Sequence, residues 1–215
     1  MEDFVSQILG WLYFSVWSFS FYPQVYLNYR LKSCQAISKV LLCLNIVGFY
    51  SYSLYTLKPN DLVSLSDKVF AIHAFTLSVI IVAQCYYYDH MNKFYIPVLA
   101  FILVGLYFID TRYLGPIKVI ITLVKYLPQI RLNYTNHSTI GFSTTGVLMD
   151  STGGILSLLQ LFYDAYLDRV DFSHILNANA TKLGLSSASL FMDFILISQA
   201  VTYRKPNEEI IKDFV

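Results

Sequence analysis

The stretch Phe21–Tyr29, FYPQVYLNY, organises this chain, because a close copy of it, YLPQIRLNY, returns at Tyr126–Tyr134. Each copy carries a Pro-Gln pair inside an apolar run. A proline within a helix removes one backbone donor and clashes with the preceding turn, so it bends the helix. The repetition predicts two bent helices that serve as paired hinges. The candidate hinge residues are Pro23, Gln24, Pro128 and Gln129.

The similarity extends beyond the Pro-Gln pairs. A shift of 105 residues aligns Pro23 with Pro128 without a gap, and eight of the 26 pairs from Pro23 to Gly48 are then identical. Unrelated segments match far less often, so the two segments are predicted to be copies of one structural unit. The same shift pairs Asn45 with Asp150, and this position is therefore neutral in one copy and acidic in the other.

The composition is that of a membrane protein. Of the 215 residues, 56% are hydrophobic and 13% are charged, whereas a soluble domain carries about 25% charged residues. A helix needs about 20 mostly apolar residues to cross a bilayer. Seven such runs are found, at residues 5–29, 37–57, 67–88, 94–112, 114–135, 142–167 and 183–204. They occupy most of the chain and leave no room for a soluble domain.

The repeat predicts the architecture. The chain is expected to be an all-α membrane protein, with seven transmembrane helices arranged as two parallel three-helix bundles joined by a linker helix. The predicted units are residues 1–89 with the first Pro-Gln motif, 90–113 with the linker, and 114–215 with the second motif and a cytosolic tail. Two-unit transporters with parallel repeats place their site at the repeat interface, near the middle of the membrane.

The distribution of Lys and Arg predicts the orientation. With the amino terminus outside, eight of these residues fall on the cytosolic side and five on the other, and cytosolic loops carry the excess. The chain starts with Glu2 and Asp3 instead of the positive region of a signal peptide, so the first run is expected to be a true span. The prediction is a lumenal amino terminus and a cytosolic carboxyl terminus.

The ionisable residues inside the predicted spans include Lys125, Asp150 and Asp193. A charge at the centre of a bilayer is costly, so such residues are candidates for function. Asp193 is flanked by apolar residues in SLFMDFIL, which favours its neutral form. Lys125 precedes Pro128 by about one turn, and Asp150 lies in the first half of the sixth run. An ion pair between Lys125 and Asp150 that only holds helices together is the alternative.

Two further titratable residues, Asp67 and His73, open the third run. Residues near the membrane interface can stay solvated, so a functional and a structural interpretation are both open for them. His73 would titrate in the range of an acidic organelle. The three cysteines have no metal-like spacing. No metal and no catalytic constellation is predicted, and an enzyme is not expected.

The motifs FYPQVYLNYRLKS at 21–33 and KYLPQIRLNYTNHS at 125–138 resemble the paired motifs of the PQ-loop family. With SDKVFAIHA at 66–74, VLMDSTGGILSLLQ at 147–160 and TKLGL at 181–185, the chain is similar to the branch of this family that exports cystine from lysosomes. The resemblance implies a SWEET-like fold in a lysosomal or vacuolar membrane. It also implies proton-coupled export of cystine to the cytosol by alternating access, with protons as the coupling ion and no other cofactor.

The resemblance also implies roles for individual residues. Cystine carries two carboxylates and two ammonium groups, so Lys125 suits a carboxylate, Asp150 an ammonium group, and Asn133 either of them. The residues that match substrate-binding positions are Lys125, Asn133, Asp150 and Lys182. Those implied in proton coupling are Asp193, Asp150, Asp67 and His73. The chain departs from the family pattern at Gly146, where the family has an asparagine.

Two other functions are open at this point. The same fold could carry a cationic amino acid, whereas a sugar carrier would not need Lys125, Asp150 and Asp193. A seven-helix retrieval receptor that binds a peptide without transporting it would also tolerate bent helices and acidic groups; pH-dependent peptide binding without flux would identify it. The expected partners are a small-molecule substrate and the lipid bilayer, and no nucleic acid.

Overall fold

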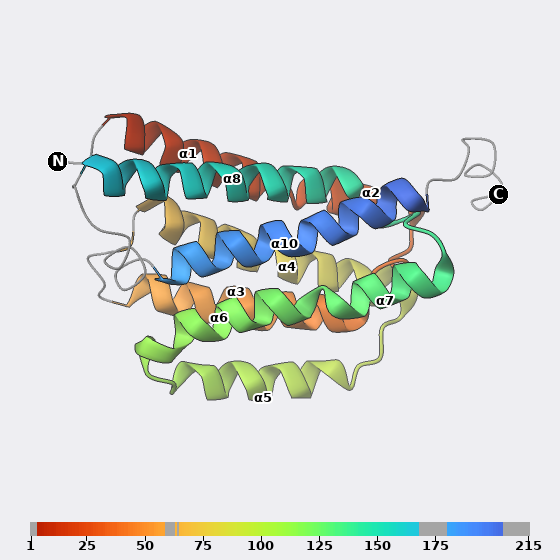
Figure 1. The fold of residues 1–215 in the computed structure, drawn as a ribbon. Coiled ribbons are helices and arrows are strands. Elements are labelled where there is room, and N and C mark those ends of the chain that lie inside the picture. Colours follow the sequence, from red (N-terminus) through yellow and green to blue (C-terminus); the bar gives the residue numbers. More distant parts are fainter. Residues whose placement is uncertain (1–3, 59–62, 64, 168–179, 204–215) are drawn as a thin grey trace.

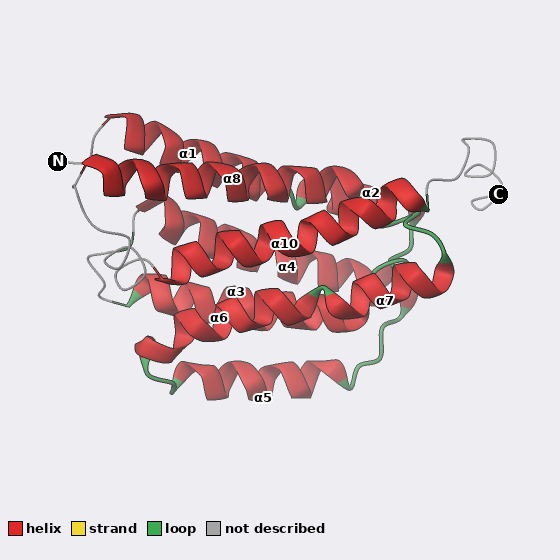
Figure 2. Cartoon of the chain, in the orientation of Figure 1, coloured by secondary structure: helices red, strands yellow, loops and turns green. Residues whose placement is uncertain are grey.

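The computed structural model describes the chain except residues 1–3, 59–62, 64, 168–179 and 204–215. Within this part all regular structure is helical (Figure 2). The helices are α1 (Phe4–Phe19), α2 (Tyr22–Leu31), α3 (Lys39–Leu57), α4 (Leu65–Asp89), α5 (Tyr95–Tyr107), α6 (Thr111–Lys125), α7 (Leu127–Asn136), α8 (Thr144–Leu167) and α10 (Ala180–Thr202). The predicted cytosolic tail lies outside the described residues.

The predicted apolar runs are confirmed as helices, with ends that differ by a few residues. Among the described helices, α3, α4 and α10 are by themselves long and apolar enough to cross a membrane. The linker α5 is a shorter apolar helix of 13 residues. The first and fifth runs are each divided into two consecutive helices, α1 with α2 and α6 with α7.

The divisions fall just before the two Pro-Gln pairs, where the sequence predicted bends. α1 ends at Phe19 and α2 begins at Tyr22, one residue before Pro23. α6 ends at Lys125, and α7 begins one residue before Pro128. A proline in the first turn of a helix costs little, because the backbone N–H groups of that turn have no partner within the helix. The chain therefore restarts a helix at each proline.

The helices form two bundles that repeat each other, joined by the linker (Figure 1). In the first bundle α4 packs against both α1 and α3, and in the second α10 packs against both α6 and α8. The bundles meet where α1 packs along α8 and α3 packs along α6. The linker α5 lies at the edge, against α3. The chain is thus an all-α membrane protein built from two three-helix bundles and a linker helix.

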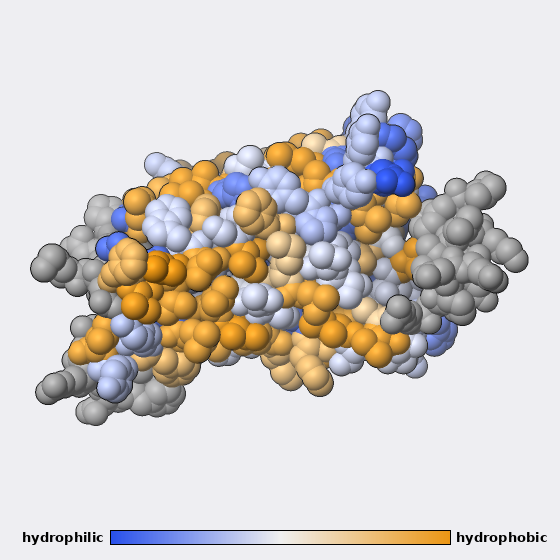
Figure 3. All heavy atoms as spheres, turned by 90° about the horizontal axis from the view of Figure 1, so that it is seen from above, coloured by the Kyte–Doolittle hydropathy of each residue, from blue (hydrophilic) through white to orange (hydrophobic). Residues whose placement is uncertain are grey.

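The surface fits a lipid environment. Figure 3 shows hydrophobic residues spread along the length of the described helices on one face, with the largest hydrophilic group near one end. Large apolar side chains point outward on several helices, including Phe101 on α5 and Phe194 on α10, which are 82% and 70% exposed. Water would not favour so many exposed apolar groups, whereas lipid tails accept them.

A close contact joins α1 to α8 near the middle of the molecule. A side chain at Gly153 would overlap the indole ring of Trp17, so the absence of a side chain lets the two helices approach. The indole Nε1 of Trp17 donates a hydrogen bond of 2.9 Å to the backbone carbonyl of Asp150. Gly153 therefore serves the packing of the two helices, and the contact also holds the segment that carries Asp150.

Candidate functional site

A cavity of about 640 Å³, counting the part open to solvent, lies between the two bundles. In the first bundle its lining comes from the turn between α1 and α2, from α2, α3 and α4, and from the loop before α3. In the second bundle it comes from the end of α6, the junction of α6 and α7, α8 and the loop before α8. The residues that line it include Ser20, Gln24, Asn45, Lys125, Gly146 and Asp150. The predicted position between the repeats therefore coincides with a cavity.

Most of the lining consists of residue pairs related by the shift of 105 residues. The lining pairs are Ser20 with Lys125, Phe21 with Tyr126, Ile37 with Phe142, Leu41 with Gly146, Leu42 with Val147, and Asn45 with Asp150. Corresponding positions of both repeats thus face one space, as expected for a cavity on the axis that relates them. The chemical character of three pairs differs between the repeats, which makes the cavity polar and charged mainly on the side of the second repeat.

Lys125 brings an ammonium group into this cavity from the last residue of α6. Its side chain is 5% exposed, and its Nζ donates a hydrogen bond of 3.0 Å to Oδ1 of Asn45 on α3. The same Nζ lies 4.4 Å from the ring centre of Tyr126. A buried ammonium group beside an amide is suited to hold a carboxylate.

Two carboxylates stand close together on the other side of the cavity. Asp150 lines the cavity, and its Oδ2 accepts hydrogen bonds from Tyr126 (3.2 Å) and from Ser189 (2.8 Å). Asp193 is fully buried on α10 and is not part of the lining. Its Oδ2 accepts a hydrogen bond from Ser151 (3.2 Å) and contacts Oγ of Ser189 (3.5 Å).

A second buried lysine, Lys118, was not among the predicted site residues. It lies on α6 and is 3% exposed, with its Nζ 3.6 Å from the ring centre of Phe49. Lys125 lies 5.5 Å from the same ring centre, so both ammonium groups flank one aromatic side chain. The sequence spacing could have identified this residue. Lys118 precedes Lys125 by seven residues, which is about two helical turns, so both side chains lie on the same face of the helix.

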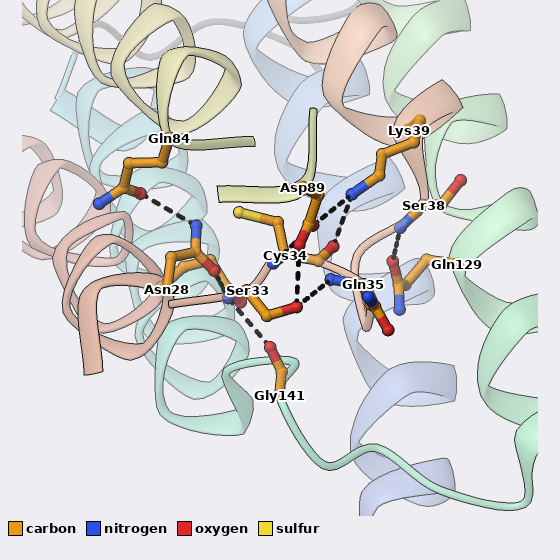
Figure 4. Close-up of polar contacts among 11 residues, drawn as sticks. Asn28, Ser33, Cys34, Gln35, Ser38, Lys39, Gln84, Asp89, Gln129 and Gly141 are labelled. Carbon is orange, nitrogen blue, oxygen red and sulfur yellow. Dashed lines mark hydrogen bonds and ion pairs between the residues drawn. The ribbon is translucent and has the colours of Figure 1, made fainter. Parts of the chain in front are cut away.

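Amide groups form a hydrogen-bonded network at the end of the molecule where α2 and α7 lie (Figure 4). In the first repeat, Gln24 Nε2 donates to Asn28 Oδ1 (2.8 Å), and Asn28 Nδ2 donates to Gln84 Oε1 (3.0 Å). Gln24 also reaches across to the second repeat. Its Nε2 donates to the carbonyl of Gly141 (3.1 Å), and its Oε1 accepts from the backbone amide of Ser143 (2.8 Å).

The second repeat makes the same bonds in return. Gln129 Nε2 donates to Asn133 Oδ1 (2.8 Å), and Asn133 Nδ2 donates to Gln199 Oε1 (3.0 Å). Across the interface, Gln129 Nε2 donates to the carbonyl of Ala36 (2.9 Å). Gln129 Oε1 accepts from the amide of Ser38 (2.8 Å), a bond that Figure 4 shows. Each Pro-Gln glutamine therefore binds the loop of the other bundle. Asn133 belongs to this network and does not line the cavity.

The loop of the first repeat has an additional attachment that Figure 4 also shows. Asp89, the last residue of α4, accepts hydrogen bonds from the backbone amide of Cys34 (2.8 Å) and from the hydroxyl of Ser33 (3.1 Å). Its Oδ2 also forms an ion pair of 3.1 Å with Lys39. This attachment holds the segment to which Gln129 binds.

Another polar cluster lies at the opposite end of the bundles and contains two of the predicted residues. Asp67, which is 6% exposed, accepts a hydrogen bond of 2.9 Å from the hydroxyl of Tyr13. Lys182 Nζ donates to Tyr13 Oη (3.3 Å) and to Gln160 Oε1 (2.5 Å). Lys182 is therefore separate from the cavity that Lys125 and Asp150 line.

His73 lies apart from both clusters. Its Nε2 is 3.1 Å from the hydroxyl of Tyr22, and its Nδ1 is buried without a hydrogen bond to the described residues. Among the predicted residues, the structure thus brings Lys125, Asp150 and Asp193 together. The described residues contain no group of three or more potential metal ligands.

Sequence reasoning missed Tyr126, Ser189 and Phe49 at the cavity and beside it. Aromatic residues and serines are frequent throughout the spans, so nothing in their sequence context separates these three from the rest. Asn45 carried a clear signal, since the shift of 105 residues pairs it with Asp150.

Comparisons with known proteins agree with this architecture. A model of the PQ loop repeat family matches residues 5–63 and 111–170, one match in each bundle. A cystinosin homolog of Dictyostelium discoideum is 36% identical, over 95% of this chain and 84% of its own length. The cystinosin of Drosophila melanogaster is 34% identical, over 98% of this chain and 61% of its own length.

A protein named cystine transporter in Saccharomyces cerevisiae is 29% identical, and the match covers 98% of both chains. The chain spans only about three fifths of the length of some relatives, with 58% of a cystinosin homolog of Caenorhabditis elegans covered. The family match nevertheless includes both Pro-Gln motifs and every residue that lines the cavity except Ile81. The chain belongs to the PQ-loop repeat family of helical membrane proteins, in which it is a homologue of cystinosin.

Proposed function

We propose that this protein exports L-cystine from the acidic lumen of a lysosome or vacuole to the cytosol, coupled to protons. The observation that carries the proposal is the cavity between the repeats, where a buried ammonium group, an amide and a carboxylate face one space. Cystine presents a carboxylate and an ammonium group at each end. Lys125 and Asn45 suit its carboxylate, and Asp150 with the Tyr126 hydroxyl suits its ammonium group. The names of the relatives support this choice of substrate.

Lys125 weighs against a cationic amino acid as the substrate. It brings an ammonium group to the lining of the cavity, and a cationic side chain of a substrate would be repelled there. Cystine brings two carboxylates. A retrieval receptor would require a surface for a peptide, whereas this cavity lies between the bundles.

The proposed mechanism is alternating access between the two sides of the membrane. With the amino terminus in the lumen, the reciprocal glutamine bonds lie at the cytosolic end and hold that end closed. The bends before Pro23 and Pro128 serve as the hinges about which the bundles rock apart when these bonds break. A buried carboxylate that is neutral costs far less to move within the membrane than an ionised one. Protonation of Asp193 from the acidic lumen, by a proton that it shares with Asp150, therefore permits reorientation, and release of the proton to the cytosol resets the carrier.

Transport assays on purified protein test the proposal. Proteoliposomes with an acidic exterior should take up radiolabelled cystine saturably, and the uptake should collapse when the proton gradient is dissipated. Unlabelled cystine should compete, whereas lysine and glucose should not. Competition by lysine at similar concentrations would favour the cationic amino acid.

Asp193→Asn is the informative variant, because it keeps the size of the side chain and removes the proton site. The variant should bind cystine, and its residual transport should no longer respond to the gradient. Unchanged coupling in both Asp193→Asn and Asp150→Asn would contradict the assigned proton sites. Folded wild-type protein that gives no flux above empty liposomes would contradict the transport function itself and favour the receptor.

A further inference from the structure

The two carboxylates differ in their access to the cavity. Asp150 lines it, whereas Asp193 is fully buried behind it on α10. The Oδ1 of Asp193 is buried and makes no hydrogen bond with the described part of the chain. An ionised carboxylate with a bare oxygen in a membrane interior is costly, so this environment fits a neutral acid. A proton that enters or leaves Asp193 must therefore pass through a neighbouring group.

One hydroxyl group touches both carboxylates. Ser189 Oγ lies 2.8 Å from Asp150 Oδ2 and 3.5 Å from Asp193 Oδ2, and the serine side chain is itself buried. A hydroxyl donates one hydrogen bond and accepts up to two. It can therefore donate to one carboxylate while it accepts from the other, provided that only the second is protonated.

The proximity of the two carboxylates favours a single shared proton. The titratable groups that face the pair are Lys125 and Lys118 from α6 and Tyr126 at the junction of α6 and α7. Two ionised carboxylates on one hydroxyl would repel each other, and like charges at such a distance favour protonation of one of them. Asp150 binds an ammonium group only when it is ionised, so the proton is better placed on Asp193 when substrate is bound.

We propose that Ser189 is the proton relay between Asp150 and Asp193, an inference that rests on the proposed proton-coupled transport. In the relay, the Asp150 acid gives its proton to Ser189 Oγ as the serine O–H gives its own proton to the Asp193 carboxylate. One O–H bond breaks and one forms at the serine, so the hydroxyl is regenerated and one proton has moved. The arrival of the substrate ammonium group at Asp150 drives this transfer, and the reverse transfer follows substrate release.

Ser189→Ala tests the relay, with Ser186→Ala as the matched control. Ser186 is also buried on α10, one turn earlier, where its Oγ bonds the hydroxyl of Ser157 at 3.0 Å and no carboxylate. Ser189→Ala should lower gradient-driven cystine uptake by at least about tenfold, as general acid–base groups commonly contribute that much or more. Exchange of labelled for unlabelled cystine at equal pH should persist, since Lys125 and Asp150 are intact.

The variant Ser189→Thr should restore gradient-driven uptake, because it returns the hydroxyl. Ser186→Ala should resemble the wild type in the shape of its pH profile. Gradient-driven uptake in Ser189→Ala within about twofold of the wild type would overturn the relay, and so would failure of Ser189→Thr to restore it in folded protein.

Infrared difference spectra after a pH step provide a readout that needs no transport. The carboxylic acid band that Asp193→Asn removes should appear rapidly in the wild type and in Ser186→Ala, and slowly or not at all in Ser189→Ala. Wild-type protein without cystine flux but with this pattern would contradict the proposed function and leave the relay supported. An identical band in Ser189→Ala, formed at the wild-type rate, would overturn the relay even where transport is present.

Discussion

The amide network at one end of the bundles and the charged cavity near their middle use the same repeat in opposite ways. At the end, each bond of Gln24 has a counterpart made by Gln129, with lengths that agree within 0.2 Å. In the cavity the positions correspond but the side chains differ in chemistry, since Lys125 occupies the position that matches Ser20, and Asp150 the position that matches Asn45. Symmetric hydrogen bonds hold each bundle to the loop of the other in the same way. Binding a zwitterion instead requires positive and negative groups at defined positions, which the two repeats must supply differently.

Asp150→Asn removes the main chemical difference in the cavity, because both repeats then carry an amide at the corresponding position. Loss of one partner from a buried charged cluster costs about 3–5 kcal/mol. We therefore expect kcat/KM for cystine uptake to fall by at least about 100-fold. Uptake assays in proteoliposomes measure this loss. Asn45→Ala serves as the comparison and should have the smaller effect; equal losses would mean that the difference between the repeats is unimportant for binding.

Gln24→Ala and Gln129→Ala test the symmetric region. Each variant removes one side-chain bond to an asparagine and two bonds to the opposite loop, which leaves buried polar groups without partners. We expect each to lower the free energy of unfolding by about 2–4 kcal/mol, and by the same amount. Thermal unfolding in detergent micelles measures both.

Gln35→Ala is the control for the two glutamine variants, because Gln35 is exposed and its side chain makes no such bond in the described structure. Its unfolding temperature should match that of the wild type. A much larger loss for one Pro-Gln glutamine than for the other would show that the network is symmetric in geometry but not in energy.

Gly146→Ala tests a cavity position at which the side chains of the two repeats differ in size, since the corresponding residue of the first repeat is Leu41. A Cβ at Gly146 would stand 2.7 Å from the backbone carbonyl of Ser20, which cannot move without shifting the end of α1. We expect a loss of about 1–3 kcal/mol of unfolding free energy. Gly105→Ala is the matched control, because nothing lies within 4 Å of its added Cβ, and it should be neutral or stabilising. Equal stability of both variants in thermal unfolding would contradict the close approach.

Lys39→Ala removes the ion pair with Asp89, which has no counterpart at Thr144 in the second repeat. The lysine side chain is 27% exposed, and ion pairs with solvent access contribute less than about 1 kcal/mol. We expect the smallest effect of the series, and one that shrinks as salt is added. Unfolding temperatures at low and high salt measure it. A loss as large as that of Gln24→Ala would mean that the first loop depends on this pair.

The sequence predicted the fold closely because hydrophobic runs and proline act locally. Each apolar run became a helix, and each helix with a Pro-Gln pair divides just before its proline. Lys125, Asp150 and Asp193 were also found from the sequence, since a charge inside an apolar run has few structural explanations. The repeat also indicated that Asn45 and Asp150 occupy corresponding positions.

Other features depended on contacts between distant segments. The third helices of the two bundles are offset by 115 residues, as the corresponding Gln84 and Gln199 show, so the ungapped shift of 105 residues did not pair them. The contact of Ser189 with two carboxylates arises only because α10 packs against α8.

Thus the sequence by itself determined the spans, the bends, the repeat and the buried charges, because these follow from the hydrophobicity and backbone chemistry of neighbouring residues. Only the tertiary structure decided that the Pro-Gln glutamines bind the opposite loops, that Asn133 lies in their network, and that Lys182 lies outside the cavity. Hydrogen bonds act over about 3 Å, so which polar groups meet depends on how the helices pack and not on their order in the chain.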